Sequence, residues 1–224
     1  MLRDALLDAL ALLLPVECAG CGAPDRELCT GCRARLQPRP VARRLADGLP
    51  VHAGLPYDDV VRSVIVALKQ GRTGLAAALV PALGEALGRA SAGPAVDLEL
   101  CAVPSTLRAR RRRGFDPVAL LLARAGLPSA RALLPARAHA AQKTLGIAER
   151  ERNLTGVFRP RGDLTGRRFL LVDDVVTTGT TLAAVAVALR AGGAEVAGAA
   201  VVASTPRRGG NPAQTLRGPS AGTW

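Results

Sequence analysis

The chain has 224 residues, of which 49% are hydrophobic and 21% are charged, so it can build one α/β domain plus a small module, and wholesale disorder is excluded. Aromatic residues make up only 2%, which argues against a row of base-stacking platforms for nucleic acid. The formal net charge of +12 predicts an anionic partner or substrate. Only Lys69 and Lys143 among the 30 basic residues are lysines, so the excess is almost all arginine. This arginine excess also fits a compositional bias.

Residues 1–36 are predicted to hold a short amphipathic helix and a cysteine cluster. Asp4 and Asp8 interrupt the apolar N-terminus and no small-x-small cleavage pattern follows, so we do not expect a secretory signal. No uninterrupted apolar run approaches the roughly 18 residues of a membrane span. Four of the five cysteines lie in one cluster, which is typical of a reducing compartment, and we therefore expect a cytoplasmic protein.

The clustered cysteines form two C-x-x-C knuckles, Cys18 with Cys21 and Cys29 with Cys32, separated by seven residues. Two such knuckles supply the four thiolates that a structural zinc ion prefers, and four thiolates leave no open position for catalysis. Two disulfides, a redox-active pair, or a degenerate site that binds nothing remain alternatives. Cys101 stands alone in a predicted strand, where a buried core thiol is the better interpretation.

The rest of the chain is divided by composition and periodicity. Residues 37–50 are rich in Pro, Arg and Gly and are predicted to be a linker, residues 51–205 an α/β domain, and residues 206–224 a disordered tail. Helices are expected after caps at Asp58, at Thr73 (running toward Ala90) and at Asp116 (through Arg124), and over Thr181–Arg190. Strands are expected over Leu98–Val103, Phe169–Val172 and Val196–Ala203. This alternation predicts a mostly parallel sheet flanked by helices.

The stretch Leu170–Leu182 carries the strongest functional signal. A buried strand is expected to end at two carboxylates, Asp173 and Asp174, and a threonine- and glycine-rich loop then opens a helix. A helix N-terminus presents unpaired N–H groups that suit a phosphate, and paired carboxylates suit the two hydroxyls of a vicinal diol. The loop therefore predicts a site for a sugar phosphate at the carboxyl end of a strand, where open α/β sheets bind ligands. A solvated acidic turn in which Thr180 merely caps the helix is the alternative.

These thirteen residues resemble the phosphoribosyl pyrophosphate (PRPP) motif of type I phosphoribosyltransferases. Further matches follow the order seen in the ComF/GntX family: the four-cysteine module, Leu68-Lys69, Ala102–Ser105, Arg113–Asp116, Gln142–Leu145, Glu149–Asn153 and Gly156–Phe158. One departure is that Asp116-Pro117 stands where the family usually has Asn-Gln, which puts in doubt any amide contact made from those two positions.

The resemblance implies a type I phosphoribosyltransferase-like sheet, PRPP with Mg²⁺ as ligand, and specific roles along the chain. Asp173 and Asp174 would be catalytic. The phosphate-binding residues would be Val175, Val176, Thr177, Thr178, Gly179, Thr180 and Thr181. A pyrophosphate or basic-loop role would fall to Pro104, Ser105, Lys69, Arg112, Arg113 and Lys143.

The dense arginine run, Arg108 and Arg110 to Arg113, admits three interpretations. Its guanidinium groups suit a pyrophosphate, could equally neutralise DNA phosphates, or could form a solvated basic loop. Three functional hypotheses follow: a transferase of phosphoribosyl groups with an unidentified acceptor, a ribose-phosphate-binding protein without turnover, and a non-enzymatic accessory protein of DNA uptake that binds single-stranded DNA or the uptake machinery. The last is added because members of the resembling family are associated with natural competence.

Overall fold

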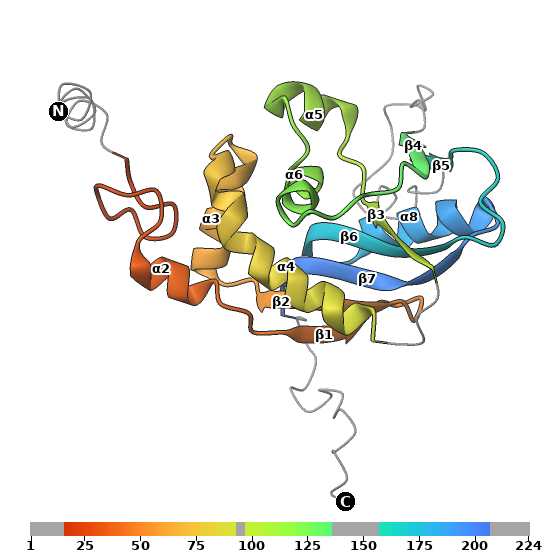
Figure 1. Cartoon of the computed structure of the whole chain (residues 1–224), viewed down its shortest axis with the longest axis horizontal. Helices are drawn as coiled ribbons and strands as arrows, with labels where there is room; N and C mark the ends of the chain where they lie inside the picture. The colour runs from red at the N-terminus through yellow and green to blue at the C-terminus, as the bar shows by residue number, and fades with distance from the viewer. Residues whose placement is uncertain (1–15, 93–96, 136–156, 207–224) are drawn as a thin grey trace, which may run out of the picture.

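The computed structural model describes residues 16–92, 97–135 and 157–206, and these form a five-stranded sheet covered by helices (Figure 1). The strands stand in the order β1 (Val41–Arg44), β2 (Pro50–Pro56), β7 (Glu195–Ser204), β6 (Arg168–Val176) and β3 (Leu98–Ala102). β1 pairs antiparallel with β2, and every other neighbouring pair is parallel. The predicted fold class, a mostly parallel sheet flanked by helices, is confirmed.

Helices cover both faces of this sheet, and each face has its own hydrophobic core. On one face lie α3 (Asp59–Lys69), α4 (Ala76–Ala90) and α6 (Pro117–Arg124), which pack against Leu170 and Val172 of β6. On the other face α8 (Thr180–Ala191) packs against Phe169 and Leu171. Beside α8 lies a separate two-stranded sheet of β4 (Leu133–Pro135) and β5 (Phe158–Pro160).

The helix starts follow the predicted caps in two of three cases. The carboxylate of Asp58 accepts the N–H of Val61 at 3.0 Å and opens α3, and that of Asp116 accepts the N–H groups of Val118 and Ala119 and opens α6. The cap predicted at Thr73 is wrong, because Thr73 begins a 3₁₀ turn, Thr73–Leu75, without a side-chain cap, and α4 starts at Ala76.

Two strands differ from their predicted extent. The segment 37–50, predicted to be a linker, contains β1, which has no alternating apolar pattern because it is a short and largely exposed edge strand. β6 does not stop at Val172 as expected but continues through both aspartates to Val176, paired all the way with the buried strand β7.

The cysteine module packs on the same core as α3. It includes the short helix α2 (Thr30–Arg35), and Cys18, Leu28 and Cys32 are buried with the residues of that core. Arg72 fixes it further by donating to the carbonyl oxygens of Glu17 and Glu27, at 2.7 and 3.0 Å. Along the three described stretches, no helix is both long and apolar enough to cross a bilayer.

Candidate functional site

The acidic pair lies inside the last part of β6 rather than in a solvated turn. Successive side chains of a strand alternate between its faces, so Asp174 leaves β6 on the side of α3 and Asp173 on the side of α8. Asp174 is buried, with 8% of its surface exposed, and its backbone N–H donates to Oδ1 of Asp173 at 2.8 Å. Burial raises the pKa of Asp173 to about 7, and the charge of Asp174 adds to the shift.

Lys69, at the end of α3, lies at this acidic pair. Its Nζ donates to Oδ1 of Asp174 at 2.8 Å. Sequence reasoning grouped Lys69 with the arginine run and the pyrophosphate end, but within the described residues its ionic partner is Asp174. A buried carboxylate is costly without a cation, and Lys69 supplies that cation to Asp174.

The threonine-glycine loop connects β6 to α8 at the same edge of the sheet. Val175 and Val176 end the strand, Gly179 occupies the helix-cap position with φ of +87°, and α8 starts at Thr180. Thr178 Oγ1 lies 2.6 Å from Thr180 Oγ1 and accepts the Thr180 N–H at a long 3.4 Å. Over the described residues, no hydrogen bond is formed by the N–H groups of Thr177, Thr178 or Gly179. These N–H groups can therefore serve a ligand.

A segment that sequence reasoning missed supports this loop from outside. Arg43 of β1 donates from Nη1 to the carbonyl oxygen of Thr177 at 2.8 Å. Leu45 packs so closely against Gly179 that a Cβ at that position would overlap its Cδ2 atom. Arg43 is one of many arginines in a segment without periodicity, so no local signal could have identified it.

The turn after β3, residues 103–106, lies at the same edge because β3 runs parallel to β6. Pro104 and Ser105 belong to this turn, as predicted from the sequence. Oδ2 of Asp116 accepts the N–H of Ser105 at 3.3 Å while Oδ1 caps α6. Asp116, the departure from the family pattern, thus connects the turn to the next helix through its carboxylate.

The arginine run forms a helix, α5 (Leu107–Arg113), which sequence reasoning did not predict. Thr106 caps it through Oγ1, which accepts the N–H of Ala109 at 3.2 Å, and Gly114 ends it in the left-handed conformation. Arg112 and Arg113 lie in the last turn of α5, the helix that follows residues 103–106. Arg112 is exposed and Arg113 is half-buried. Lys143 and the matches over Gln142–Leu145 and Glu149–Asn153 lie outside the described residues.

The four clustered cysteines come together as the two knuckles predict. Their sulfur atoms all lie within 4.8 Å of one another, and the Sγ atoms of Cys21 and Cys29 are 3.7 Å apart. Four sulfurs at ~2.3 Å from a tetrahedral ion would be about 3.8 Å apart, so the spacing fits such an ion. Cys18 Sγ also accepts the N–H of Cys29 at 3.3 Å, and the Cys29 sulfur accepts that of Cys32 at the same distance. The cluster can hold a metal ion such as zinc.

Burial and hydrogen bonding shift the pKa values of these thiols in opposite directions. Burial would raise the pKa of Cys18, but N–H groups of the knuckle backbone outweigh it and lower the pKa to about 6. Burial and the neighbouring sulfurs raise the pKa of Cys32. Cys101 is buried in the core as predicted, and burial raises its pKa to about 12, so its thiol is neutral at ordinary pH.

Comparisons with known proteins agree with this arrangement. Residues 121–218 match the phosphoribosyl transferase domain. The chain is 32% identical over 187 residues to the "DNA utilization protein YhgH" of Salmonella typhimurium strain LT2, a match that covers 79% of either chain. It is 33% identical over 189 residues, with the same coverage, to the protein of that name from Escherichia coli strain K12.

Among solved structures, orotate phosphoribosyltransferase from Aeropyrum pernix aligns with 78% of this chain and 91% of its own, at 19% identity and a TM-score of 0.36. The family assignment depends on the domain match and the curated relatives. Together with the acidic pair, the threonine-glycine loop and the four-cysteine module, they show that this chain belongs to the ComF/GntX family of type I phosphoribosyltransferase-like proteins.

Proposed function

We propose that this protein binds a ribose 5-phosphate, as PRPP with Mg²⁺, across the carboxyl ends of β6 and β3, and transfers the phosphoribosyl group to an acceptor. The observation that carries the proposal is the loop 177–181, which places unpartnered N–H groups at the start of α8 directly after two acidic residues. The starts of α3 and α6 also carry carboxylates, but there Asp58 and Asp116 themselves accept the N–H groups of the helix.

The phosphate end of the ligand would bind the loop. The N–H groups of Thr177, Thr178 and Gly179 supply donors, and the start of α8 supplies the positive end of a helix dipole. The hydroxyls of Thr178 and Thr180 already lie within hydrogen-bond distance of each other and would turn toward the phosphate oxygens. Arg43 and Leu45 hold the loop backbone in place from the other side.

The sugar would lie next to the acidic pair. Asp173 leaves β6 on the side of α8, toward the phosphate loop, and would accept hydrogen bonds from the ring hydroxyls. Its raised pKa is the result of poor solvation, which a ligand hydroxyl would relieve. Asp174 would act from the other side through Oδ2, because Oδ1 is held by Lys69.

The pyrophosphate end would face the 103–106 turn and the arginines that follow it. When bound, Mg²⁺ would neutralise pyrophosphate oxygens and assist departure of the leaving group. The protein's own contribution would be positional, with Ser105 and the last turn of α5 orienting the leaving group and the acidic pair orienting the sugar.

Isothermal titration with PRPP and Mg²⁺ tests the proposal directly. The wild-type chain should bind, and Asp173→Asn/Asp174→Asn should weaken binding by about a hundredfold or more, since two charge-assisted contacts are removed. Asp25→Asn/Asp59→Asn is the matched control, because both aspartates are exposed and lie outside the site. Absence of binding to the wild type, or equal losses in the two double variants, would refute the proposal.

We propose separately that the four cysteines hold a structural zinc ion. The sulfur spacing and the N–H···S bonds within the knuckles support this assignment. Metal analysis after purification without chelators should find about one equivalent of zinc per chain. Cys21→Ser/Cys29→Ser should lose the metal, whereas Cys101→Ser should keep it. Less than about half an equivalent in the wild type would contradict the assignment.

A second candidate function is binding of single-stranded DNA by α5. It is favoured by the exposed arginines of this helix and by the name of the curated relatives, "DNA utilization protein". Neutralising Arg110 to Arg113 should then flatten the salt dependence of binding to a labelled single strand, because each lost phosphate contact lowers the slope. Binding with an unchanged salt slope in this variant would exclude α5 as the DNA surface.

A further inference from the structure

Two of the N–H groups that the threonine-glycine loop offers to a ligand are oriented by the carbonyl groups that precede them. The described peptide bonds are all trans, and in a planar trans peptide the N–H of one residue points opposite to the C=O of the residue before it. The N–H of Thr177 is therefore directed by the carbonyl of Val176, and the N–H of Thr178 by the carbonyl of Thr177. The groups that hold these two carbonyls decide where the two donors point.

The two carbonyls are held by different parts of the sheet. The carbonyl oxygen of Val176 accepts the N–H of Thr205, directly after β7, at 3.0 Å. This bond is made by backbone alone and continues the pairing of β6 with β7. The carbonyl oxygen of Thr177 instead accepts Nη1 of Arg43, a side chain of β1, at 2.8 Å. The direction of the Thr178 N–H thus depends on one side chain that lies far away in the sequence.

Strand β1 holds this side chain in place and contacts the loop a second time. Arg43 pairs with Val51 of β2 and is half-buried. Leu45, two residues further along, packs against Gly179 so closely that a Cβ added there would overlap it. The segment therefore contacts the loop at one polar point, the carbonyl of Thr177, and at one apolar point, Gly179. These contacts place the loop backbone relative to β1 from both of its ends.

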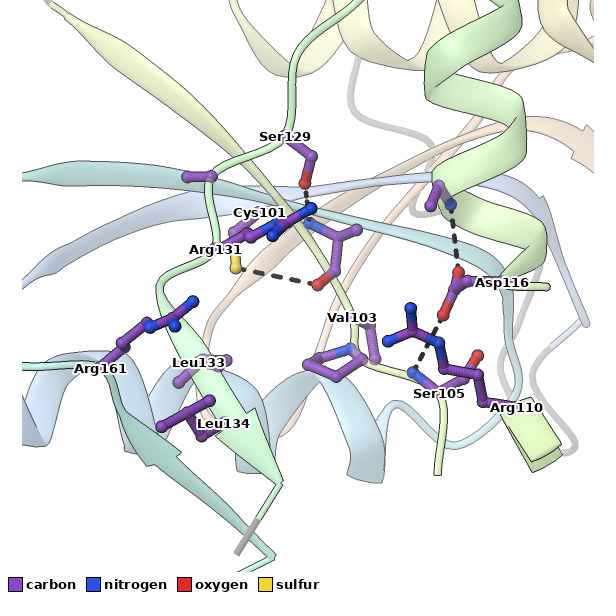
Figure 2. A pocket seen from close by; sticks show the side chains of 14 residues that line it. Cys101, Val103, Ser105, Arg110, Asp116, Ser129, Arg131, Leu133, Leu134 and Arg161 are labelled. Carbon is purple, nitrogen blue, oxygen red and sulfur yellow. Dashed lines mark hydrogen bonds between the residues drawn. The ribbon is translucent and has the colours of Figure 1, made fainter. Parts of the chain in front are cut away.

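The turn after β3 is shaped by other elements. Figure 2 shows that the N–H of Ser105 donates to the carboxylate of Asp116, at 3.3 Å. The contacts that shape the turn 103–106 thus come from the start of α6, whereas those that shape the loop come from β1 and β7. A change at Arg43 should therefore affect the phosphate end of a bound ligand and spare its pyrophosphate end.

We propose that Arg43 is a positioning residue for the phosphate loop, which directs the N–H of Thr178 toward the 5-phosphate of the ligand by holding the carbonyl of Thr177. The inference rests on the proposed function and adds a residue that lies outside the thirteen-residue motif, on another strand. Arg43 acts through the backbone and does not contact the ligand. Successive N–H groups that are held in one direction form a concave site for an anion, so a misdirected N–H weakens that site.

Calorimetric titration with ribose 5-phosphate, and separately with pyrophosphate and Mg²⁺, tests the inference. Arg43→Met should weaken binding of ribose 5-phosphate by about tenfold, since one donor loses its alignment, and should keep pyrophosphate binding within about twofold of the wild type. Arg43→Lys keeps a charged donor and should recover part of the loss. Arg44→Met is the matched control, because Arg44 is the next residue of β1 and also donates to a backbone carbonyl, that of Gly48, at 3.1 Å. It should stay within about twofold of the wild type for both ligands.

The amide resonances of the loop give a second readout, which a general loss of structure would not produce. Inorganic phosphate should shift the amide signals of Thr177 and Thr178 in the wild type. In Arg43→Met the response of Thr178 should shrink, whereas that of Thr177 should remain, because the β7 backbone still holds the carbonyl of Val176. Equal losses of response at the two amides would overturn the positioning role.

The ligand pair separates this inference from the function on which it rests. Pyrophosphate binding by Arg43→Met also reports on folding, since an unfolded chain would lose both ligands. Equal affinity of the wild type and Arg43→Met for ribose 5-phosphate, or equal losses in Arg43→Met and Arg44→Met, would overturn the inference and leave the proposed function standing. A wild type that binds pyrophosphate but no ribose 5-phosphate would refute both.

Discussion

The carboxyl ends of β6 and β3 lie at the same edge of the sheet but differ in how their charges are compensated. At β6 the acidic pair has a cation, because Lys69 reaches Asp174 from α3. At β3 the arginines of α5 outnumber Asp116, whose carboxylate is occupied in capping α6. In the proposed function, the acidic pair of β6 would accept the sugar hydroxyls and the arginines after β3 would face the pyrophosphate end.

The largest effect on the β6 side is expected from Gly179→Ala. Alanine at φ of +87° is strained, and its Cβ would also overlap Leu45, so we expect a loss of about 3 kcal/mol in the free energy of unfolding. Urea denaturation measures this loss, and titration with PRPP measures the accompanying loss of binding.

Gly48→Ala supplies the matched control for that variant. Gly48 also has a positive φ, of +83°, but a Cβ added there would meet nothing within 4 Å, so only the backbone cost of about 1–2 kcal/mol should appear. The double change Leu45→Ala/Gly179→Ala should remove the overlap. Equal losses in the two glycine variants would show that contact with Leu45 does not constrain the loop.

Lys69→Met should have the next largest effect, because it removes the cation and leaves the buried carboxylate of Asp174 in place. We expect a loss of about 2 kcal/mol, less than for a fully buried pair because the Lys69 side chain is 30% exposed. Thermal or urea unfolding measures it. Adding Asp174→Asn should recover part of the loss, and a double variant no more stable than Lys69→Met would contradict a direct ion pair.

Asp173→Asn should change the pH dependence of stability. The folded pKa of Asp173 is raised to about 7, whereas an unfolded aspartate has a pKa near 3.8, so the unfolded chain releases this proton first. The contribution of Asp173 is therefore fully present below about pH 4 and is lost as the pH rises toward and through about 7. The asparagine variant should gain stability relative to the wild type over this interval. Parallel pH profiles of unfolding would refute the shift.

The regular parts of this fold were predictable from the sequence because their signals are local. Asp58 and Asp116 cap helices with their own side chains. The apolar runs of sequence around Leu170 and Val201 predict buried strands, and both residues are buried. The cysteine spacing predicted the cluster for the same reason, since each knuckle is a short turn of chain.

The contacts that position the site were not predictable because they join segments far apart in the chain. Lys69 meets Asp174 across 105 positions, and Arg43 meets the loop carbonyl of Thr177 across 134. Neither contact can be inferred from the periodicity or the composition of the sequence. Strand β1 was missed for a related reason, since an exposed edge strand needs no apolar face and is defined by its partner β2.

The smallest effect on stability, and the sharpest test of the charge difference, is expected from Asp116→Asn. Asparagine caps helices about as well as aspartate, so the free energy of unfolding of Asp116→Asn should stay within about 0.5 kcal/mol of the wild type, whereas Asp116→Ala should lose about 1 kcal/mol.

The neutral side chain of Asp116→Asn should, however, increase the net positive charge at the end of β3 and strengthen binding of inorganic pyrophosphate. It should also lower the pKa of Asp173, which the charge of Asp116 helps to raise. Pyrophosphate binding that stays unchanged or weakens in Asp116→Asn would show that the carboxylate serves the anion end, for example by holding the N–H of Ser105, and that charge does not divide the two strand ends.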